Sequence, residues 1–487
     1  MKKSILMKNT LIILITGFVV KIIGMLGKIF TTRILGLSGM SLYVLSYPTL
    51  LLFVSISGFS MNNTISKLVS EGVATKKYSP KLLLIKGIKL SLLISIICLI
   101  IYLLTIKSIS IYMLKNEDLY IPLLSGVFLI PLVGASDALR GYFNGLKKIP
   151  IASTSLFIEQ IFRTTSSILG VYFGIKHNII LANSLLFIGL AIGEIASITY
   201  CLIKIKKEKL IHYENTKNET TILFKTSSTL TFSRLIGSIS YFLEPIVYTF
   251  ILTYLNYKTE LIHETYTMID AYSIPLLTMV SFIPFALSTA IIPHISESYA
   301  KKDYSSLNNY INKAYFFTIY PASFCLLFIY FFDNELMLFI YNTNTGADIA
   351  KSFSLIFIFY YISAITNSIL QAMGKIKVLF LNSILINCLR LILIVIMSYF
   401  IQIGPLSIMY AIIISIIISS IVLFFILLKN TNLTISINTI IKYIIVLLFI
   451  YSLLNLLNQF NLNFILSAFI SGLLFLLIFI MILKKKL

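Results

Sequence analysis

Two lysines lie within the first apolar stretch of the sequence, where charged side chains are unexpected. They belong to a series spaced by four, three and four residues: Gly17, Lys21, Gly24 and Lys28. This spacing places all four on one stripe of a helix. Because an ammonium group inside a membrane is costly, it needs water, a carboxylate or an anionic ligand beside it. Lys21 and Lys28, with Arg33 near the outer end of the stretch, are candidate anion ligands. Anchoring of the helix at the membrane surface is the alternative.

A second candidate group lies in the apolar stretch 227–255. Arg234 and Ser238 are four residues apart and share a helical stripe, and Glu244 follows on the same helix. Arg234 is a further candidate cation of a substrate cavity, with a role as an anchor at the cytoplasmic end of the span as the alternative. Glu244 is a candidate counter-ion or coupling residue.

Several other charges fall inside apolar stretches. Glu159 and Arg163 are four residues apart, so they can neutralise each other on one helix, and a structural ion pair is the favoured interpretation. A role as counter-ion or coupling residues is the alternative. Asp137 and Arg140 form a similar pair, with Arg140 expected at the cytoplasmic end of its helix.

Two carboxylates have no partner near them in the sequence. Glu194 and Asp270 each lie within an apolar stretch. Either could be the counter-ion of a first-helix lysine or part of an ion-coupling site.

No residue pattern indicates an enzyme or a metal site. The four histidines are scattered, the four cysteines lie far apart in apolar runs, and the sequence has neither a phosphate-binding glycine loop nor a nucleophile elbow. We expect no catalytic activity, no metal and no cofactor.

The elements that must position these charges are membrane-spanning helices. The chain of 487 residues is 58% hydrophobic and only 12% charged, which excludes a soluble globular protein. About fourteen apolar stretches can cross a hydrocarbon layer of about 30 Å. They fall at 10–33, 41–66, 82–106, 120–140, 150–174, 180–203, 227–255, 266–293, 314–332, 353–373, 379–400, 406–428, 443–458 and 464–483.

The distribution of positive charge predicts the orientation in the membrane. Most of the 39 lysines and arginines fall on the side that holds both termini, including the run from Lys204 to Lys225. Cytoplasmic loops carry such an excess, so we expect both termini in the cytoplasm and the chain in the cell membrane. The same distribution explains the net charge of +21 without a nucleic-acid partner.

An internal repeat predicts the arrangement of the helices. The segment ISKLVSEGVATKKYS at 65–79 aligns with IIPHISESYAKKDYS at 291–305 at one constant offset, and both segments lie on the cytoplasmic side. Such a parallel repeat predicts two six-helix lobes related by a pseudo-two-fold axis along the membrane normal. The expected divisions are lobes at 1–205 and 227–430, a cytoplasmic linker at 206–226 and a two-helix appendix at 431–487.

Five segments carry a recognisable pattern: VKIIGMLGKIFTTRILGLSGMSLYVLSYP at 20–48, ISKLVSE at 65–71, LRGYFNGLKKIPIASTSLFIEQIFR at 139–163, SRLIGSISYFLEPIVYT at 233–249 and IPHISESYAKKDY at 292–304. They resemble the stage V sporulation protein B and lipid II flippase-like family of the multidrug/oligosaccharidyl-lipid/polysaccharide exporter superfamily. The likeness covers nearly the whole chain.

The resemblance implies a central cationic cavity between two lobes, alternating access, and a groove for a lipid tail at the last two helices. It supports Lys21, Lys28 and Arg33 as cavity cations. Lys28 stands where relatives commonly have arginine, which keeps the charge but loses the bidentate fork for a diphosphate.

The sequence therefore predicts a flippase, acting as a monomer, for a polyprenyl-diphosphate-linked sugar, with membrane lipid around the tail. Alternatives are an ion-coupled exporter of drugs or polysaccharides with the same fold, and a membrane assembly protein without transport activity. A cationic drug would need an acidic cavity, against which Lys21 and Lys28 argue. A polytopic glycosyltransferase would need sizeable external loops, and those loops are short here.

Overall fold

The computed structural model describes residues 2–207, 211, 213, 219–431, 437–460 and 464–486. Part of the predicted linker at 206–226 and the start of the predicted appendix lie outside these residues. Within them the chain is helical and contains no strand.

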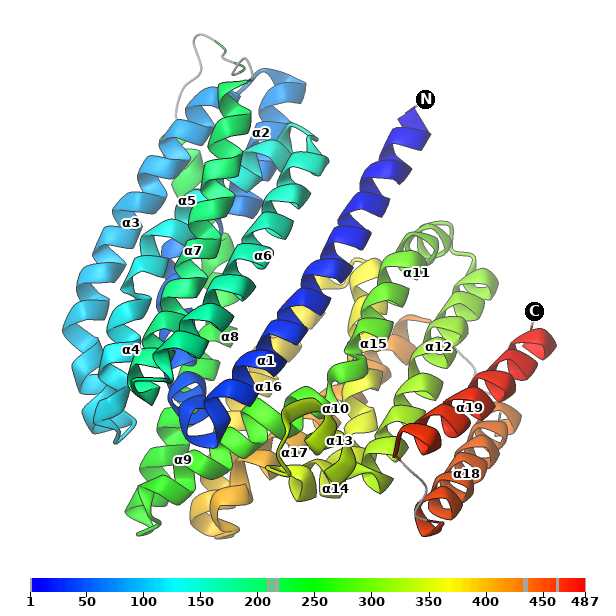
Figure 1. Ribbon diagram of the computed structural model, residues 1–487. Helices are drawn as coiled ribbons and strands as arrows, with labels where there is room; N and C mark the ends of the chain where they lie inside the picture. Colours follow the sequence, from blue (N-terminus) through cyan, green and yellow to red (C-terminus); the bar gives the residue numbers. More distant parts are fainter. Residues whose placement is uncertain are drawn as a thin grey trace. The chain divides into compact units, whose positions relative to one another are not determined.

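The first half of the chain forms long helices joined by short turns (Figure 1). The helices are α1 Lys2–Gly58, α2 Met61–Thr75, α3 Pro80–Ser108, α4 Tyr120–Ser125, α5 Leu129–Gly145, α6 Ile149–Gly174, α7 Ile179–Lys206, α8 Glu219–Tyr254 and α9 Thr259–Thr267. Gly36 interrupts α1 with φ +63°, a conformation that glycine adopts without steric cost. This break separates the first two predicted spans.

The second half contains shorter helical pieces as well as long helices. They are the π-helical turn η4 Met268–Ser273, α10 Ile274–Leu277, α11 Phe282–Ala300, α12 Tyr304–Phe331, α13 Asp333–Tyr341, α14 Ala347–Ser354, α15 Ile358–Ala372, α16 Ile376–Val395, α17 Ser407–Asn430, α18 Ile437–Gln459 and α19 Phe464–Lys486. Helix α13 corresponds to none of the predicted spans.

The length and composition of the helices confirm a multi-pass membrane protein. Among the described residues, nine helical segments are long and apolar enough to cross a membrane, and shorter apolar helices accompany them. Large apolar side chains on the outside, such as Leu104 and Phe250, are largely exposed. In a bilayer such side chains face lipid rather than water.

Contacts divide the chain into two compact units, Met1–Tyr266 and Thr267–Leu487. Helix α8 belongs to the first unit, where it packs against α1, α2 and α3. A division by contacts does not test an internal repeat, so the predicted lobe boundaries stay a prediction.

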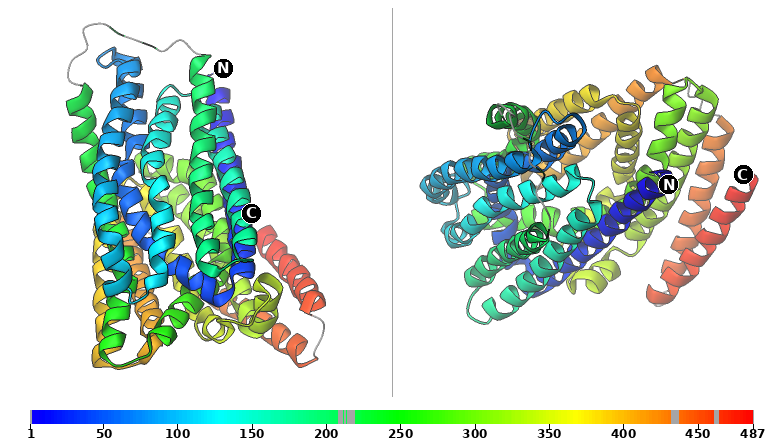
Figure 2. Two further views of the ribbon diagram at one scale, coloured as in Figure 1. Left: turned by 60° about the vertical axis from the view of Figure 1, so that its left-hand side comes forward. Right: turned by 90° about the horizontal axis from the view of Figure 1, so that it is seen from above.

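The two units differ in the contacts that hold their helices together. In the first unit α5, α6 and α7 pack against one another side by side (Figures 1 and 2). In the second unit, α12 lies beside the neighbouring pair α18 and α19 (Figure 2). Aromatic rings fill the contact between these helices. Phe316 stacks on Phe479 with ring centroids 5.0 Å apart, and Phe324 stacks on Phe475 at 4.6 Å. These two ring pairs hold α19 against α12 within the second unit.

Candidate functional site

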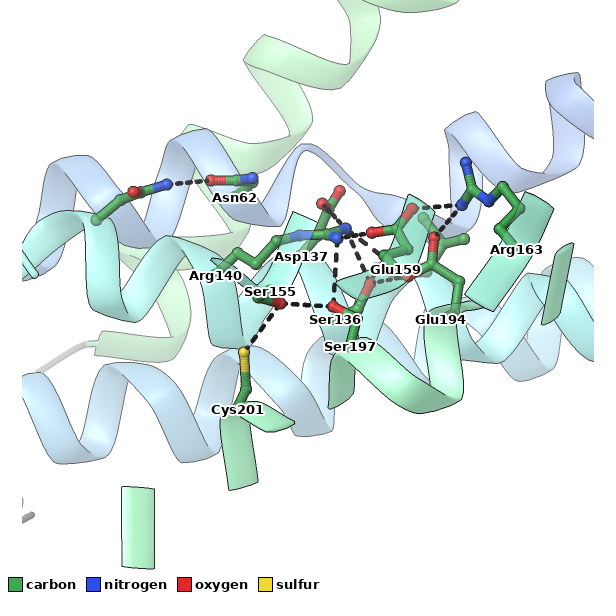
Figure 3. A network of polar contacts seen from close by, with 12 residues as sticks. Asn62, Ser136, Asp137, Arg140, Ser155, Glu159, Arg163, Glu194, Ser197 and Cys201 are labelled. Atoms are coloured by element: carbon green, nitrogen blue, oxygen red, sulfur yellow. Dashed lines mark hydrogen bonds and ion pairs between the residues drawn. The ribbon is translucent and has the colours of Figure 1, made fainter. Parts of the chain in front are cut away.

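Five charged side chains meet among α5, α6 and α7 of the first unit (Figure 3). Asp137 and Arg140 come from α5, Glu159 and Arg163 from α6, and Glu194 from α7. We call these five residues the charge cluster. Arg140, Glu159 and Glu194 are almost completely buried, with 4%, 6% and 2% of their surface exposed. Charges buried this deeply are stable only when they are paired and hydrogen-bonded.

Arg140 is the centre of the charge cluster. Its Nη1 contacts Glu159 Oε2, its Nη2 lies 3.1 Å from Asp137 Oδ1, and the same Nη2 lies 3.7 Å from Glu194 Oε2. One guanidinium thus neutralises parts of three carboxylates from three helices. The planar fork of arginine permits this geometry, whereas lysine offers a single point charge.

Arg163 closes the charge cluster on the opposite side. Its Nη2 contacts Glu159 Oε1 and lies 2.9 Å from Glu194 Oε1. Arg140, Glu159, Arg163 and Glu194 therefore form a closed ring of alternating charge, with Asp137 attached at Arg140. The ion pair predicted between Glu159 and Arg163 and the one between Asp137 and Arg140 both form.

Hydroxyl groups support the ring. Ser136 donates to Glu194 Oε2 at 2.5 Å and accepts from Arg140 Nη2 at 3.0 Å. Ser197 accepts weakly from Arg140 Nη1 at 3.4 Å and lies 2.7 Å from Ser155 Oγ, which in turn accepts from Cys201. Such a network holds the charged groups in one arrangement.

Glycines bring α6 and α7 close enough for the ring to form. A Cβ added at Gly193 would lie 2.8 Å from the Glu159 carbonyl oxygen and 2.7 Å from Arg163 Cβ, and one at Gly189 would lie 2.6 Å from the Ser167 backbone nitrogen. A methyl group at either position would push the two helices apart.

We expect Gly193→Ala to destabilise the protein by about 1–3 kcal/mol, because overpacking at a tight helix contact forces backbone shifts. Thermal unfolding in detergent measures the effect. The matched control is Gly472→Ala on α19, where an added Cβ meets nothing within 4 Å. A Gly193→Ala protein as stable as the control would contradict the tight contact.

A pocket of about 440 Å³ opens between α1 and the charge cluster. Its charged lining residues are Lys28, Glu159, Arg163 and Glu194. Polar side chains that can donate or accept hydrogen bonds also line it: Thr31, Tyr43, Tyr47, Gln160, Thr164 and Ser167. The remaining lining is mostly leucine and valine. The pocket thus combines two cations and two carboxylates with hydroxyl and amide groups inside an apolar helical unit.

The predicted cavity cations occupy different environments. Lys28 is half-buried and lines the pocket, whereas Lys21 and Arg33 on α1 and Arg234 on α8 are exposed. Arg234 lies on the same helix as Ser238, whose hydroxyl bonds Ser55 at 3.1 Å. The roles of all four cations stay predictions.

The predicted counter-ion and coupling residues also lie in different places in the structure. Glu159, Arg163 and Glu194 come together in the charge cluster, while Glu244 is buried on α8 outside it. Asp270 is half-buried in η4 of the second unit. Glu194 therefore has two arginine partners, although none is near it in the sequence.

Sequence reasoning missed the position of Arg140 and the hydroxyl groups around it. Arg140 was expected near a cytoplasmic helix end, but α5 continues to Gly145 and Arg140 is buried. One signal was available: Ser136 stands four residues before Arg140, and Ser197 three residues after Glu194. Such spacings place a hydroxyl beside each charge on one helix face.

The donor set suits an anion better than a metal ion. Within the described part of the chain, no group of three or more His, Cys, Asp or Glu side chains could hold a metal ion. All four oxygens of Glu159 and Glu194 already accept bonds from arginine or serine. Arg163 Nε, by contrast, is a buried donor without a hydrogen-bond partner among the described residues.

Comparisons with family models cover most of the chain. The model described as polysaccharide biosynthesis protein matches residues 6–299, and the model described as MatE matches residues 269–400.

Two curated relatives are similar over most of their length. Stage V sporulation protein B of Bacillus subtilis (strain 168) is 28% identical over 394 residues, which cover 79% of this chain and 76% of that protein. Lipid II flippase MurJ of the same organism is 23% identical over 426 residues, covering 80% and 77%.

Among solved structures, a lipid II flippase MurJ in an inward closed conformation superposes with a TM-score of 0.71 and 19% identity, covering 98% of this chain and 99% of that one. This likeness shows the fold, and it confirms the predicted all-helical, two-lobe fold class. The family resemblance of the sequence segments is confirmed as well.

Proposed function

The chain belongs to the polysaccharide biosynthesis protein family, and from this premise we propose that it translocates a lipid-linked oligosaccharide precursor across the cell membrane. It is a multi-pass membrane protein of a superfamily of flippases and transporters. The named activity of one relative, a lipid II flippase, supports a polyprenyl-diphosphate-linked sugar as substrate.

The observation that carries the proposal is the pocket beside α1. A diphosphate and hydrated sugars cannot enter hydrocarbon without losing their solvation, which costs several kcal/mol or more. Lys28 and Arg163 offer positive charge at the pocket, and Gln160 and Thr164 offer groups that can bond sugar hydroxyls. The pocket can therefore replace part of the water that the headgroup leaves behind.

The carboxylates of the pocket do not favour a cationic drug. Glu159 and Glu194 each contact both Arg140 and Arg163, so their negative charge is already compensated. A cation entering the pocket would meet Lys28 and Arg163 at the same time. We therefore assign the pocket to an anionic headgroup.

In the proposed mechanism, Lys21, Lys28 and Arg234 attract the diphosphate, and the polyprenyl tail stays in lipid beside α18 and α19. The two predicted lobes alternate in their access to the two membrane faces, and one chain suffices for transport. No catalytic step on the substrate is involved.

The substrate is tested by a transport panel with purified protein in liposomes. We expect translocation of lipid II or another polyprenyl-diphosphate sugar, and none of a cationic dye such as rhodamine 6G. Dye transport without lipid transport would replace this proposal by that of a drug exporter. Transport of none of them would favour an assembly role.

The proposed orientation places both termini and the loop from Lys204 to Lys225 in the cytoplasm. In a cysteine-free chain, Lys207→Cys should resist an impermeant thiol reagent in intact cells, whereas Lys258→Cys on the other side should react. Both lysines are exposed, so accessibility within the protein is matched. The reverse labelling pattern would invert the topology.

A further inference from the structure

The charges around the pocket balance only when Lys28 is counted. The closed ring of Arg140, Glu159, Arg163 and Glu194 is neutral, and Asp137 adds one negative charge. Lys28, which lines the same pocket, adds one positive charge. A ligand that draws Lys28 or Arg163 into its own ion pair therefore leaves more negative than positive charge among the remaining residues of this set.

Arg163 is the arginine of the ring that a ligand can reach. Its side chain is 29% exposed and lines the pocket, whereas the side chain of Arg140 is only 5% exposed. Its Nη2 serves both glutamates, while its buried Nε has no hydrogen-bond partner among the described residues, so the two ion pairs do not occupy the whole guanidinium. An anion that enters the pocket would attract both Arg163 and Lys28.

Release of Arg163 would expose a particular pair of oxygens. A single nitrogen, Nη2, serves Oε1 of Glu159 and Oε1 of Glu194. The Oε2 atoms keep their partners, because Glu159 Oε2 stays on Arg140 and Glu194 Oε2 stays on Ser136. Two carboxylate oxygens that share one donor would face each other across the place that Arg163 leaves. Two carboxylates at such a site cannot both stay ionised, and they share one proton instead.

We propose, on the basis of the proposed function, that Glu159 and Glu194 are a proton-accepting pair that takes up one proton when an anionic lipid headgroup draws Arg163 and Lys28 away. The proton comes from hydronium in the adjoining water. It forms one O–H bond on a carboxylate oxygen, leaves a water molecule behind and changes the charge of the pair by one unit. No oxidant or other reactant is needed.

Every element packed against the pair contributes groups that set its charge. These groups are Lys28, Tyr43 and Tyr47 from α1, Asp137 and Arg140 from α5, Arg163 from α6, and Cys201 from α7. Tyr43, Tyr47 and Cys201 are neutral near pH 7, so lysine and the two arginines supply the positive charge. Loss of the Arg163 contact thus reduces the positive charge that stabilises the two ionised carboxylates.

The consequence for transport is a link between substrate and proton. A headgroup that enters with negative charge would be accompanied by a proton, which offsets one of the negative charges that the headgroup brings. The reverse exchange would follow when the headgroup leaves and Arg163 returns to Glu159 and Glu194. A pH difference across the membrane would then bias the direction of transport.

The test is calorimetric titration of the full-length protein in detergent with lipid II, repeated near neutral pH in two buffers of different ionisation enthalpy. We expect uptake of about one proton for each lipid II bound. Lipid II binding without proton uptake overturns this inference and leaves the proposed function standing. An absence of lipid II binding overturns the proposed function itself.

Two variants locate the proton. Glu159→Gln and Glu194→Gln should each reduce the proton uptake several-fold. The matched control is Asp333→Asn, which changes a buried carboxyl on α13 that pairs with Lys351, outside the charge cluster and the pocket. If Asp333→Asn removes the uptake while Glu194→Gln keeps it, the assignment to the pair is wrong. The wild-type titration decides the linkage even if a variant fails to fold.

Discussion

Arg140→Ala is expected to cause the largest loss of folded protein among single substitutions in the first unit. It would leave Glu159 and Glu194 buried with Arg163 as their remaining arginine partner, and Asp137 without its own. Removal of one partner from a buried ion network costs about 3–5 kcal/mol, because the remaining charges keep their desolvation penalty. That is a large fraction of a typical folding free energy of about 5–15 kcal/mol.

The measurement is thermal unfolding of the purified variant in detergent, together with its yield in the membrane. Lys301→Ala is the control, because Lys301 and Glu297 form an ion pair in which both side chains are largely exposed. Such pairs contribute little, so the control should unfold as the wild type does. Arg140→Lys should fall between the two, since one ammonium cannot reach three carboxylates. An Arg140→Ala protein with wild-type stability would contradict the central position of Arg140.

Lys28→Ala is expected to cause the largest loss of substrate affinity. Lys28 is the α1 cation that lines the pocket, and a charge-assisted hydrogen bond contributes about 1.5–3 kcal/mol. Affinity for lipid II should fall roughly ten- to hundredfold, while membrane insertion should be unaffected or improved. Titration of the variant with lipid II measures the change.

Three further variants sharpen this result. Lys28→Arg should keep or improve binding, because arginine restores the fork for a diphosphate. Lys28→Glu should repel the headgroup. Lys107→Ala removes an exposed lysine of α3 outside the pocket and should bind as the wild type does. Equal affinity of Lys28→Ala and Lys107→Ala would mean that Lys28 only anchors its helix.

Features that depend on local sequence could be predicted well. The length of the apolar stretches predicted the membrane helices, and Gly36, with φ +63°, breaks α1 between the first two predicted spans. The four-residue spacing of Glu159 and Arg163 predicted their ion pair, because helix geometry alone brings such residues together.

Features that depend on packing between helices could not be predicted. Glu194 meets Arg163 and Arg140 because Gly189 and Gly193 let α7 approach α6, and no local pattern in the sequence shows which helices are neighbours. Arg140 was misplaced for the same reason. Near a helix end, a charge that faces water and one that faces another helix have the same local sequence. The lobe boundaries stay predictions, because the contacts within the two units do not test the repeat.

The central claim is that cations on α1 carry an anionic lipid headgroup across the membrane. The most direct measurement is the rate of lipid II translocation in proteoliposomes by the wild type and by the double variant Lys21→Ala with Lys28→Ala, at equal amounts of inserted protein. We predict that the wild type translocates lipid II well above protein-free liposomes and that the double variant falls to their level. A double variant that translocates lipid II at the wild-type rate would contradict the account.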